Sequence, residues 1–197
     1  MKSKFFIGIT FPNSNSQVNG IIQLKKRFDP GGFGSGEIYA SLTPPFELEN
    51  QFKAKVLEDL YDDADSFFSG LGNITVECSG VEVFKGRKNF LFLKSQIRDE
   101  LYHFQKLLMG NYQFSKEVGP ERKYFQSSYI LLGKYKEEED LHSAIEACSE
   151  YLEFPFQLKI EQITLFEKTL CGWTAVGNPF SFESESYATS APFIGTF

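Results

Sequence analysis

The order of hydrophobic and polar positions along the chain predicts a mixture of strands and helices. Residues 5–11, FFIGITF, form a continuous apolar run of strand length that ends at Pro12 and Asn13. In residues 37–46, EIYASLTPPF, the apolar positions alternate with Glu37, Tyr39 and Ser41, which is the period of a half-buried strand. Similar patterns predict strands at 73–80, 81–86, 88–94, 128–135, 156–168 and 171–182.

Helical spacing separates these strands. In residues 16–28 the apolar residues recur every three or four positions until Asp29 and Pro30 end the pattern. The same spacing predicts helices at 49–68, 96–109 and 136–153. Residues 110–127 read as a polar loop, and the last residues, 183–197, have weak periodicity.

This order of elements predicts an α+β fold. Each half of the chain holds a strand–helix–strand–helix run, which suggests two pseudo-equivalent lobes of antiparallel sheet with helices on their outer faces. We therefore expect one bilobal domain over residues 1–182, followed by a tail over 183–197.

Composition limits the classes of function. The 22 Phe and 9 Tyr predict a core filled mainly by rings, and the net charge of −6 argues against a general electrostatic grip on nucleic acid. The three cysteines are widely spaced and odd in number, so a reducing cytoplasm is the simplest interpretation. No apolar run approaches membrane-spanning length, and we expect a monomer without membrane partners.

Several short patterns give no site. His103 and His142 fall on expected helices without ligand partners at suitable spacing, so no metal and no cofactor are expected. The run GGFGSG at 31–36 follows a helix and precedes a strand, the reverse of a phosphate-binding loop; we interpret it as a flexible loop that could cover a cleft. The acidic run at 61–66 lies within a helix and is interpreted as a solvated face.

Two strands carry a resemblance to a known family. The stretches YASLTPPF at 39–46 and YILLGKY at 129–135, with FFIGITFP at the start of the chain, resemble the two-histidine phosphoesterase superfamily. This superfamily includes 2′-5′ RNA ligase-like proteins and cyclic phosphodiesterases. It is defined by two His-x-Thr/Ser-x tetrapeptides on strands in opposite lobes, and the resemblance extends over nearly the whole chain.

The family motif is degenerate in this sequence. The resemblance places Tyr39 and Tyr129 at the two histidine positions, Ser41 at the first hydroxyl position and Leu131 at the second. Imidazole, with a pKa near ~6.5, exchanges protons at neutral pH, whereas an ordinary tyrosine with a pKa near ~10 stays protonated. We therefore expect the ordinary histidine chemistry to be absent, with no confident catalytic residue.

Two functions from different classes remain open. The first is a non-catalytic protein that binds an RNA end, a cyclic nucleotide or a small phosphate ester in a central groove lined by Tyr39, Ser41 and Tyr129. Arg122 and Lys123 are the best candidates for phosphate contacts. The second is a phosphoesterase or RNA-processing enzyme with altered catalytic residues. Either requires the alternating residues Ile38, Ala40, Leu42, Ile130 and Leu132 to be buried behind the sheets.

Overall fold

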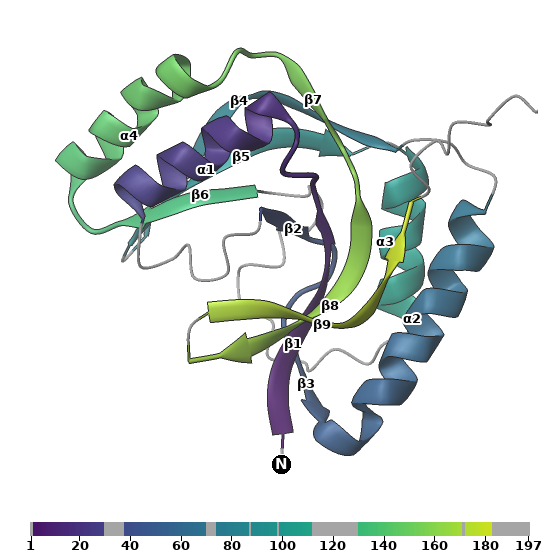
Figure 1. Ribbon diagram of the computed structural model, residues 1–197. Helices are drawn as coiled ribbons and strands as arrows, with labels where there is room; N and C mark the ends of the chain where they lie inside the picture. Colours follow the sequence, from purple (N-terminus) through teal and green to yellow (C-terminus); the bar gives the residue numbers. More distant parts are fainter. Residues whose placement is uncertain are drawn as a thin grey trace, which may run out of the picture.

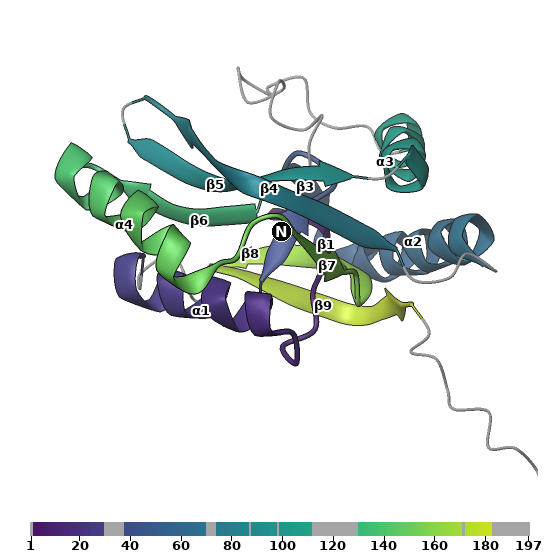
Figure 2. The same cartoon turned by 90° about the horizontal axis from the view of Figure 1, so that it is seen from above.

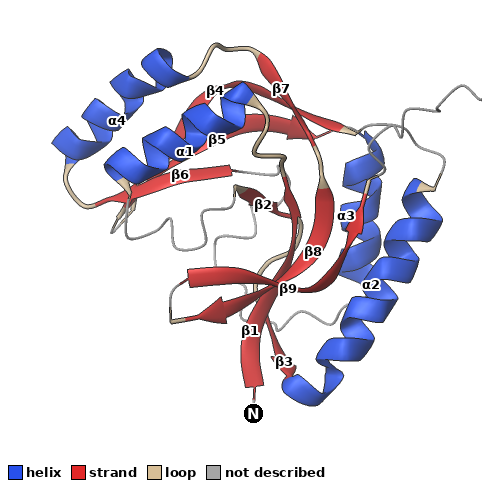
Figure 3. Cartoon of the chain, in the orientation of Figure 1, coloured by secondary structure: helices blue, strands red, loops and turns tan. Residues whose placement is uncertain are grey.

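The protein has an α+β fold in which two antiparallel sheets each carry helices on one face (Figures 1 and 3). This computed structural model describes residues 2–29, 38–69, 74–86, 88–97, 99–111, 130–170 and 172–182. The predicted fold class, with two sheet-and-helix lobes, is confirmed. No helix in the described ranges has the length and apolar character needed to cross a membrane.

The first sheet, sheet A, contains both ends of the described chain. It is built from β1 (Lys2–Thr10), β2 (Tyr39–Ser41), β3 (Phe46–Glu49), β8 (Gln162–Thr169) and β9 (Gly172–Ser181). The strand order is β2-β1-β8-β9, and β3 also pairs with β1. Helices α2 (Lys53–Phe68) and α3 (Asp99–Asn111) lie side by side along this sheet, and both contribute to the hydrophobic core (Figures 1 and 2).

The second sheet, sheet B, has the order β6-β5-β4-β7. Its strands are β4 (Thr75–Phe84), β5 (Asn89–Ile97), β6 (Ile130–Tyr135) and β7 (Phe156–Lys159). Helices α1 (Ser16–Phe28) and α4 (Glu138–Tyr151) contact each other and cover one face of it. Helix α1 begins at Asn15, whose side chain accepts hydrogen bonds from the backbone N–H groups of Gln17 and Val18.

The lobes do not follow the two halves of the chain. Helix α1 packs on sheet B although β1 and β2 belong to sheet A, and β8 and β9 return to sheet A at the end. The predicted strand 156–168 is therefore two strands, β7 and β8, in different sheets. Conversely, the strands predicted at 73–80 and 81–86 are the single strand β4, whose register shifts between Cys78 and Gly80.

Three further boundaries differ from the sequence pattern. The predicted strand 37–46 is divided into β2 and β3, since the chain leaves β1 and returns to it around the two prolines. The predicted helix 49–68 starts with a short 3-10 turn over Asn50–Phe52. The boundary between β5 and α3 also lies a few residues later than predicted, because the strand continues to Ile97.

One hydrophobic cluster runs through both lobes. It joins β1, β2 and the helices α2 and α3 to sheet B and its helices α1 and α4. All five predicted core residues belong to it and are at most 2% exposed: Ile38, Ala40, Leu42, Ile130 and Leu132. The alternation of these residues therefore leaves Tyr39, Ser41 and Leu131 on the opposite faces of their strands.

Candidate ligand-binding site

The two strands whose sequences resemble the family motifs lie next to each other. Strand β2 contacts β6, and Figure 1 shows β2 beside the end of β6. Tyr39 and Ser41 of β2 and Leu131 of β6 are half-buried. The fold therefore brings together segments that are about ninety residues apart in the sequence, as the resemblance implied.

Tyr39 belongs to a group of rings on the face of sheet A opposite α2 and α3, which we call the inner face. Its ring centroid lies 5.4 Å from that of Phe6 and 4.9 Å from that of Phe166. Phe6 also stacks on Phe166 at 4.7 Å and meets the edge of Trp173 at 4.8 Å. These four rings form the aromatic cluster of the inner face. Tyr39 is thus held against rings on one side while its own ring stays half-buried.

The environment of Tyr39 opposes ionisation of its phenol. Burial raises the pKa of Tyr39 to about 12, and the nearby negative charge of Asp29 contributes to this shift. At neutral pH the phenol is therefore protonated and can only donate or accept a hydrogen bond. It cannot act as a general base at neutral pH.

A lysine lies behind the second motif strand. Lys25 of α1 is 7% exposed, and its Nζ donates a hydrogen bond to the carbonyl oxygen of Leu131 at 2.8 Å. Burial lowers the pKa of Lys25 to about 8; Asp29 opposes this shift and Lys134 adds to it. The backbone of the degenerate motif is thus held by a cation whose proton is unusually easy to lose.

Sheet B presents rings on the face opposite α1 and α4. Leu91 and Leu93 are in the core, so Phe90 and Phe92, which alternate with them, point to the other face. Phe92 lies 6.2 Å from Phe90 with nearly parallel planes and 5.2 Å from Phe84. All three rings are half-buried, and the ammonium of Lys134 lies 5.8 Å from the centroid of Phe90. Such surfaces favour planar ligands with negative charge.

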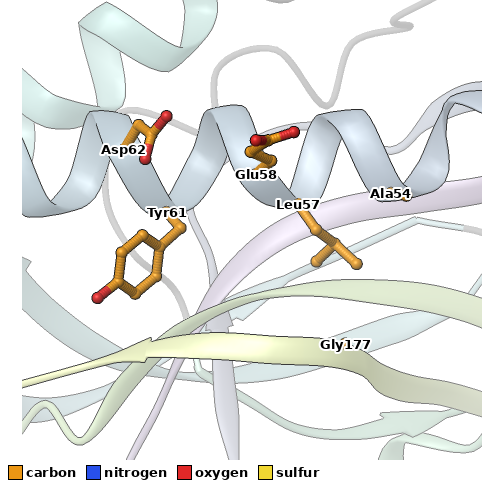
Figure 4. A pocket seen from close by; sticks show the side chains of 6 residues that line it. All are labelled: Ala54, Leu57, Glu58, Tyr61, Asp62 and Gly177. Atoms are coloured by element: carbon orange, nitrogen blue, oxygen red, sulfur yellow. The ribbon is translucent and has the colours of Figure 1, made fainter.

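A separate pocket of about 520 Å³ lies between α2 and β9 (Figure 4). It is lined by Ala54, Leu57, Glu58, Tyr61, Asp62 and Gly177. It therefore lies on the helix-covered side of sheet A, away from β2 and β6. Its two carboxylates disfavour a phosphate ligand, so we do not include it in the candidate site.

The other candidate residues from the sequence either lie outside the described residues or are exposed on helices. Tyr129, Arg122, Lys123 and the loop at 31–36 lie outside the described residues, so their roles stay predictions. His103 lies exposed on α3, and His142 is exposed on α4, 3.2 Å from a carboxylate oxygen of Glu146. Among the described residues no cluster of His, Cys, Asp and Glu could hold a metal ion.

Sequence reasoning missed Lys25 and most of the aromatic cluster. Lys25 stands in the basic run KKR at the end of α1, where a lysine is ordinarily solvated. Phe6 and Phe166 lie inside apolar strand patterns and look like core residues. The pairing of β1 with β8 could have revealed the cluster, because Phe6 and Phe166 are direct partners in that register.

Solved structures with this fold are known. Over 93% of this chain and 100% of the other, the fold matches Escherichia coli LigT complexed with 3′-AMP, with a TM-score of 0.58 and 14% identity. A Thermus thermophilus protein matches over 92% of this chain and 99% of its own, with a TM-score of 0.57 and 14% identity. A phosphoesterase matches over the same shares, with a TM-score of 0.53 and 14% identity. The chain thus has the fold of LigT and of these two further structures.

Comparison at the level of sequence adds nothing to this. No protein-family profile matches the chain, and no protein with a curated description does either. At 14% identity the structural matches establish the fold alone.

Proposed function

We propose that this chain, with the fold of the two-histidine phosphoesterases, is a degenerate 2′-5′ RNA ligase-like or cyclic phosphodiesterase-like protein. It binds a nucleotide, an RNA end or a phosphate ester between its lobes and lacks histidine-based chemistry. The observation that carries this proposal is the environment of the Tyr39 phenol, which keeps it protonated. Its phenol occupies the first motif position, packs in the aromatic cluster and has a pKa of about 12, far too high for a general base at neutral pH.

Three features support the retention of a ligand. LigT was solved with 3′-AMP bound, and this chain matches its fold over the whole of that chain. The inner face of sheet A and the face of sheet B opposite α1 and α4 both present rings on which a base can stack. Ser41 keeps the hydroxyl of the first motif, which suits a phosphate oxygen.

Binding and turnover must be measured together to test the proposal. We expect 3′-AMP to bind in calorimetry and 2′,3′-cyclic nucleotides to be left intact. Replacing Ser41 with alanine removes one neutral hydrogen bond, so Ser41→Ala should weaken binding about fivefold. Cyclic-nucleotide turnover by the wild type that Ser41→Ala abolishes would instead show an enzyme, and absence of any binding would reject the proposal.

A rescue variant tests whether only the catalytic groups are missing. Tyr39→His, Tyr129→His and Leu131→Thr together restore the four-residue motif that the resemblance defines. Each change alone should do little, because groups that act as a unit are strongly non-additive. We expect weak cleavage of cyclic phosphates by the triple variant only. The folded state of each variant is checked first by circular dichroism, since a new hydroxyl at half-buried Leu131 can cost about 1–3 kcal/mol.

A second candidate function is an enzyme with altered catalytic residues, and Lys25 favours it. A lysine with a pKa of about 8 is partly neutral near physiological pH and can accept a proton. It lies 2.8 Å from the backbone of the second motif strand. If the chain is an enzyme of this kind, Lys25→Met should abolish turnover, and the rate should rise with pH around 8.

We further propose that residues 1–182 act as one ligand-binding domain, with 183–197 as a tail. A monomer in the cytoplasm is consistent with Cys78 and Cys148, which are buried free thiols. Size-exclusion chromatography with light scattering tests the oligomeric state, and deletion of 183–197 should leave 3′-AMP affinity unchanged.

A further inference from the structure

Hydroxyl side chains gather on the inner face of sheet A around one glycine. Gly8 of β1 lies directly between Ser41 of β2 and Thr164 of β8 in the strand register. Two residues further along β1, Thr10 lies directly opposite Tyr39 of β2 and Gln162 of β8. Residues opposite each other in antiparallel strands share a face, so Ser41, Thr10 and Thr164 surround Gly8 on the face that carries Tyr39.

Two of these hydroxyls have no partner. Thr10 is 8% exposed and Thr164 is 1% exposed, and neither Oγ1 atom has a hydrogen-bond partner among the described residues. A buried hydroxyl without a partner destabilises the folded state, and most buried polar groups in proteins avoid this. Thr43, in the segment between β2 and β3, shows the ordinary arrangement, because its buried Oγ1 accepts a hydrogen bond from the N–H of Ile7 at 2.9 Å.

The space next to Gly8 is filled by its neighbours, so this position has no room for a side chain. A Cβ atom at this position would lie 2.8 Å from the carbonyl oxygen of Ala40 and 2.8 Å from the ring of Phe6. The ring of Phe166 would lie 3.1 Å away. The glycine thus lets the rings of Phe6 and Phe166 lie close against β1, next to the strand positions that carry the hydroxyl groups.

We propose that Thr10, Thr164 and Ser41 bind a phosphoryl group of the ligand through their hydroxyls. This rests on the proposed function and assigns the phosphate to residues outside the family motif. Leu131 leaves the second motif strand without a hydroxyl donor, and the two threonines supply donors from β1 and β8 instead. Phosphoryl oxygens are strong hydrogen-bond acceptors, so one phosphoryl group gives both the Thr10 and the Thr164 hydroxyl a partner.

The site is closed in the absence of ligand. Because the two threonine oxygens are withdrawn from solvent, the phosphoryl group reaches them only after a neighbouring side chain moves. The half-buried ring of Tyr39, directly opposite Thr10, is the nearest such group in the register. Its ring packs at a tilt against Phe6 and Phe166, and a base of the ligand can take over these contacts.

Thr10→Val and Thr164→Val test this inference, because valine keeps the shape of threonine and removes only the hydroxyl. In the ligand-free protein each variant should raise the melting temperature by about 2–4 °C, since an unsatisfied buried hydroxyl is lost. In calorimetry each should weaken 3′-AMP binding about fivefold, and the double variant about 25-fold. Adenosine, which lacks the phosphate, should bind all variants equally.

Thr174→Val is the matched control. Thr174 is an exposed β9 residue opposite Glu167 in the register, and this change should alter neither 3′-AMP affinity nor the melting temperature. The inference would be overturned if the wild type binds 3′-AMP and the double variant binds it with the same affinity. The proposed function would then remain intact. A lower melting temperature in the valine variants would also overturn the inference, since the hydroxyls would then have structural partners. A wild type that binds no 3′-AMP would reject both proposals.

Discussion

At the scale of single residues, the site is notable for groups whose ordinary charge or hydrogen bonding is suppressed. Tyr39 keeps its proton far above neutral pH, Lys25 gives up its proton near pH 8, and the hydroxyls of Thr10 and Thr164 are unpartnered among the described residues. The buried ammonium of Lys25 and the two unpartnered hydroxyls lower the stability of the fold, whereas the raised pKa of Tyr39 has no cost at neutral pH, where its phenol is protonated in the folded and the unfolded chain alike. Residues that cost stability in this way are more often explained by function than by folding.

Lys25 gives a prediction for stability against pH. Its pKa falls from 10.5 to about 8 on folding, so between these values the unfolded chain holds a proton that the folded protein has released. Stability therefore rises with pH across this interval, and the cost of burying the charge is fully present below pH 8. We therefore compare the free energies of unfolding of the wild type and of Lys25→Met. The difference, wild type minus variant, should increase by about 3 kcal/mol between about pH 8 and pH 10.5.

Urea unfolding of both proteins below pH 8 and near pH 10.5 measures this difference. Taking the difference cancels the titration of Tyr39, Tyr135 and Cys78, whose raised pKa values affect both proteins alike. A difference that stays constant or falls with pH would show that Lys25 is not desolvated as the structure indicates.

At the scale of elements, the position of the site depends on how α1 and α4 meet over sheet B. Lys25 reaches Leu131 only because α1 lies on β6, and α1 is placed there by its contact with α4. Gly20 makes this contact close: a Cβ there would clash with the carbonyl oxygen of Tyr151 and lie 3.0 Å from the side chain of Leu152. The lack of a side chain thus sets the distance between the two helices.

Gly20→Ala should therefore destabilise the protein although alanine is the better helix former. Helix propensity favours alanine by about 1 kcal/mol, whereas the clash with backbone should cost about 1–3 kcal/mol. Gly110→Ala on α3 is the control, because a Cβ at Gly110 meets nothing within 4 Å. Thermal unfolding should show a loss for Gly20→Ala and no loss for Gly110→Ala. Equal effects of the two changes would contradict the close approach.

At the scale of the whole molecule, the two lobes share one hydrophobic cluster and cannot be separated without exposing it. The chain also crosses between them repeatedly, since α1 packs on sheet B and β8 returns to sheet A. A ligand bound between β2 and β6 would thus contact two sheets that are held in a common core. This rigidity fixes the two sheets on either side of such a ligand, so that only side chains such as the ring of Tyr39 must move when it binds.

Cooperative unfolding of the two lobes follows from this shared core. Trp173 is the one tryptophan of the chain and reports on sheet A, while the buried thiols of Cys78 and Cys148 report on sheet B and α4. In a Cys171→Ser background, tryptophan fluorescence and thiol labelling should give the same urea midpoint. Different midpoints would show that the lobes unfold independently.

Local patterns in the sequence were sufficient for most of the elements. The alternation around Tyr39 placed Ile38, Ala40 and Leu42 in the core, and helical spacing located α1, α2 and α4 to within a few residues. These patterns succeed because burial of one face imposes its period on the chain directly. They failed at 156–168, where the chain crosses from sheet B to sheet A without a Gly, Pro, Asn, Asp or Ser that would mark a turn.

The sequence by itself determined the α+β class and the buried faces of β2 and β6, because each depends on residue identity or short-range period. Tertiary structure alone decided which residues surround Tyr39. Lys25 is desolvated because α1 lies on β6, and Thr10 and Thr164 meet around Gly8 because β8 pairs with β1. Desolvation and register join residues far apart in the chain, so no local pattern in the sequence encodes them.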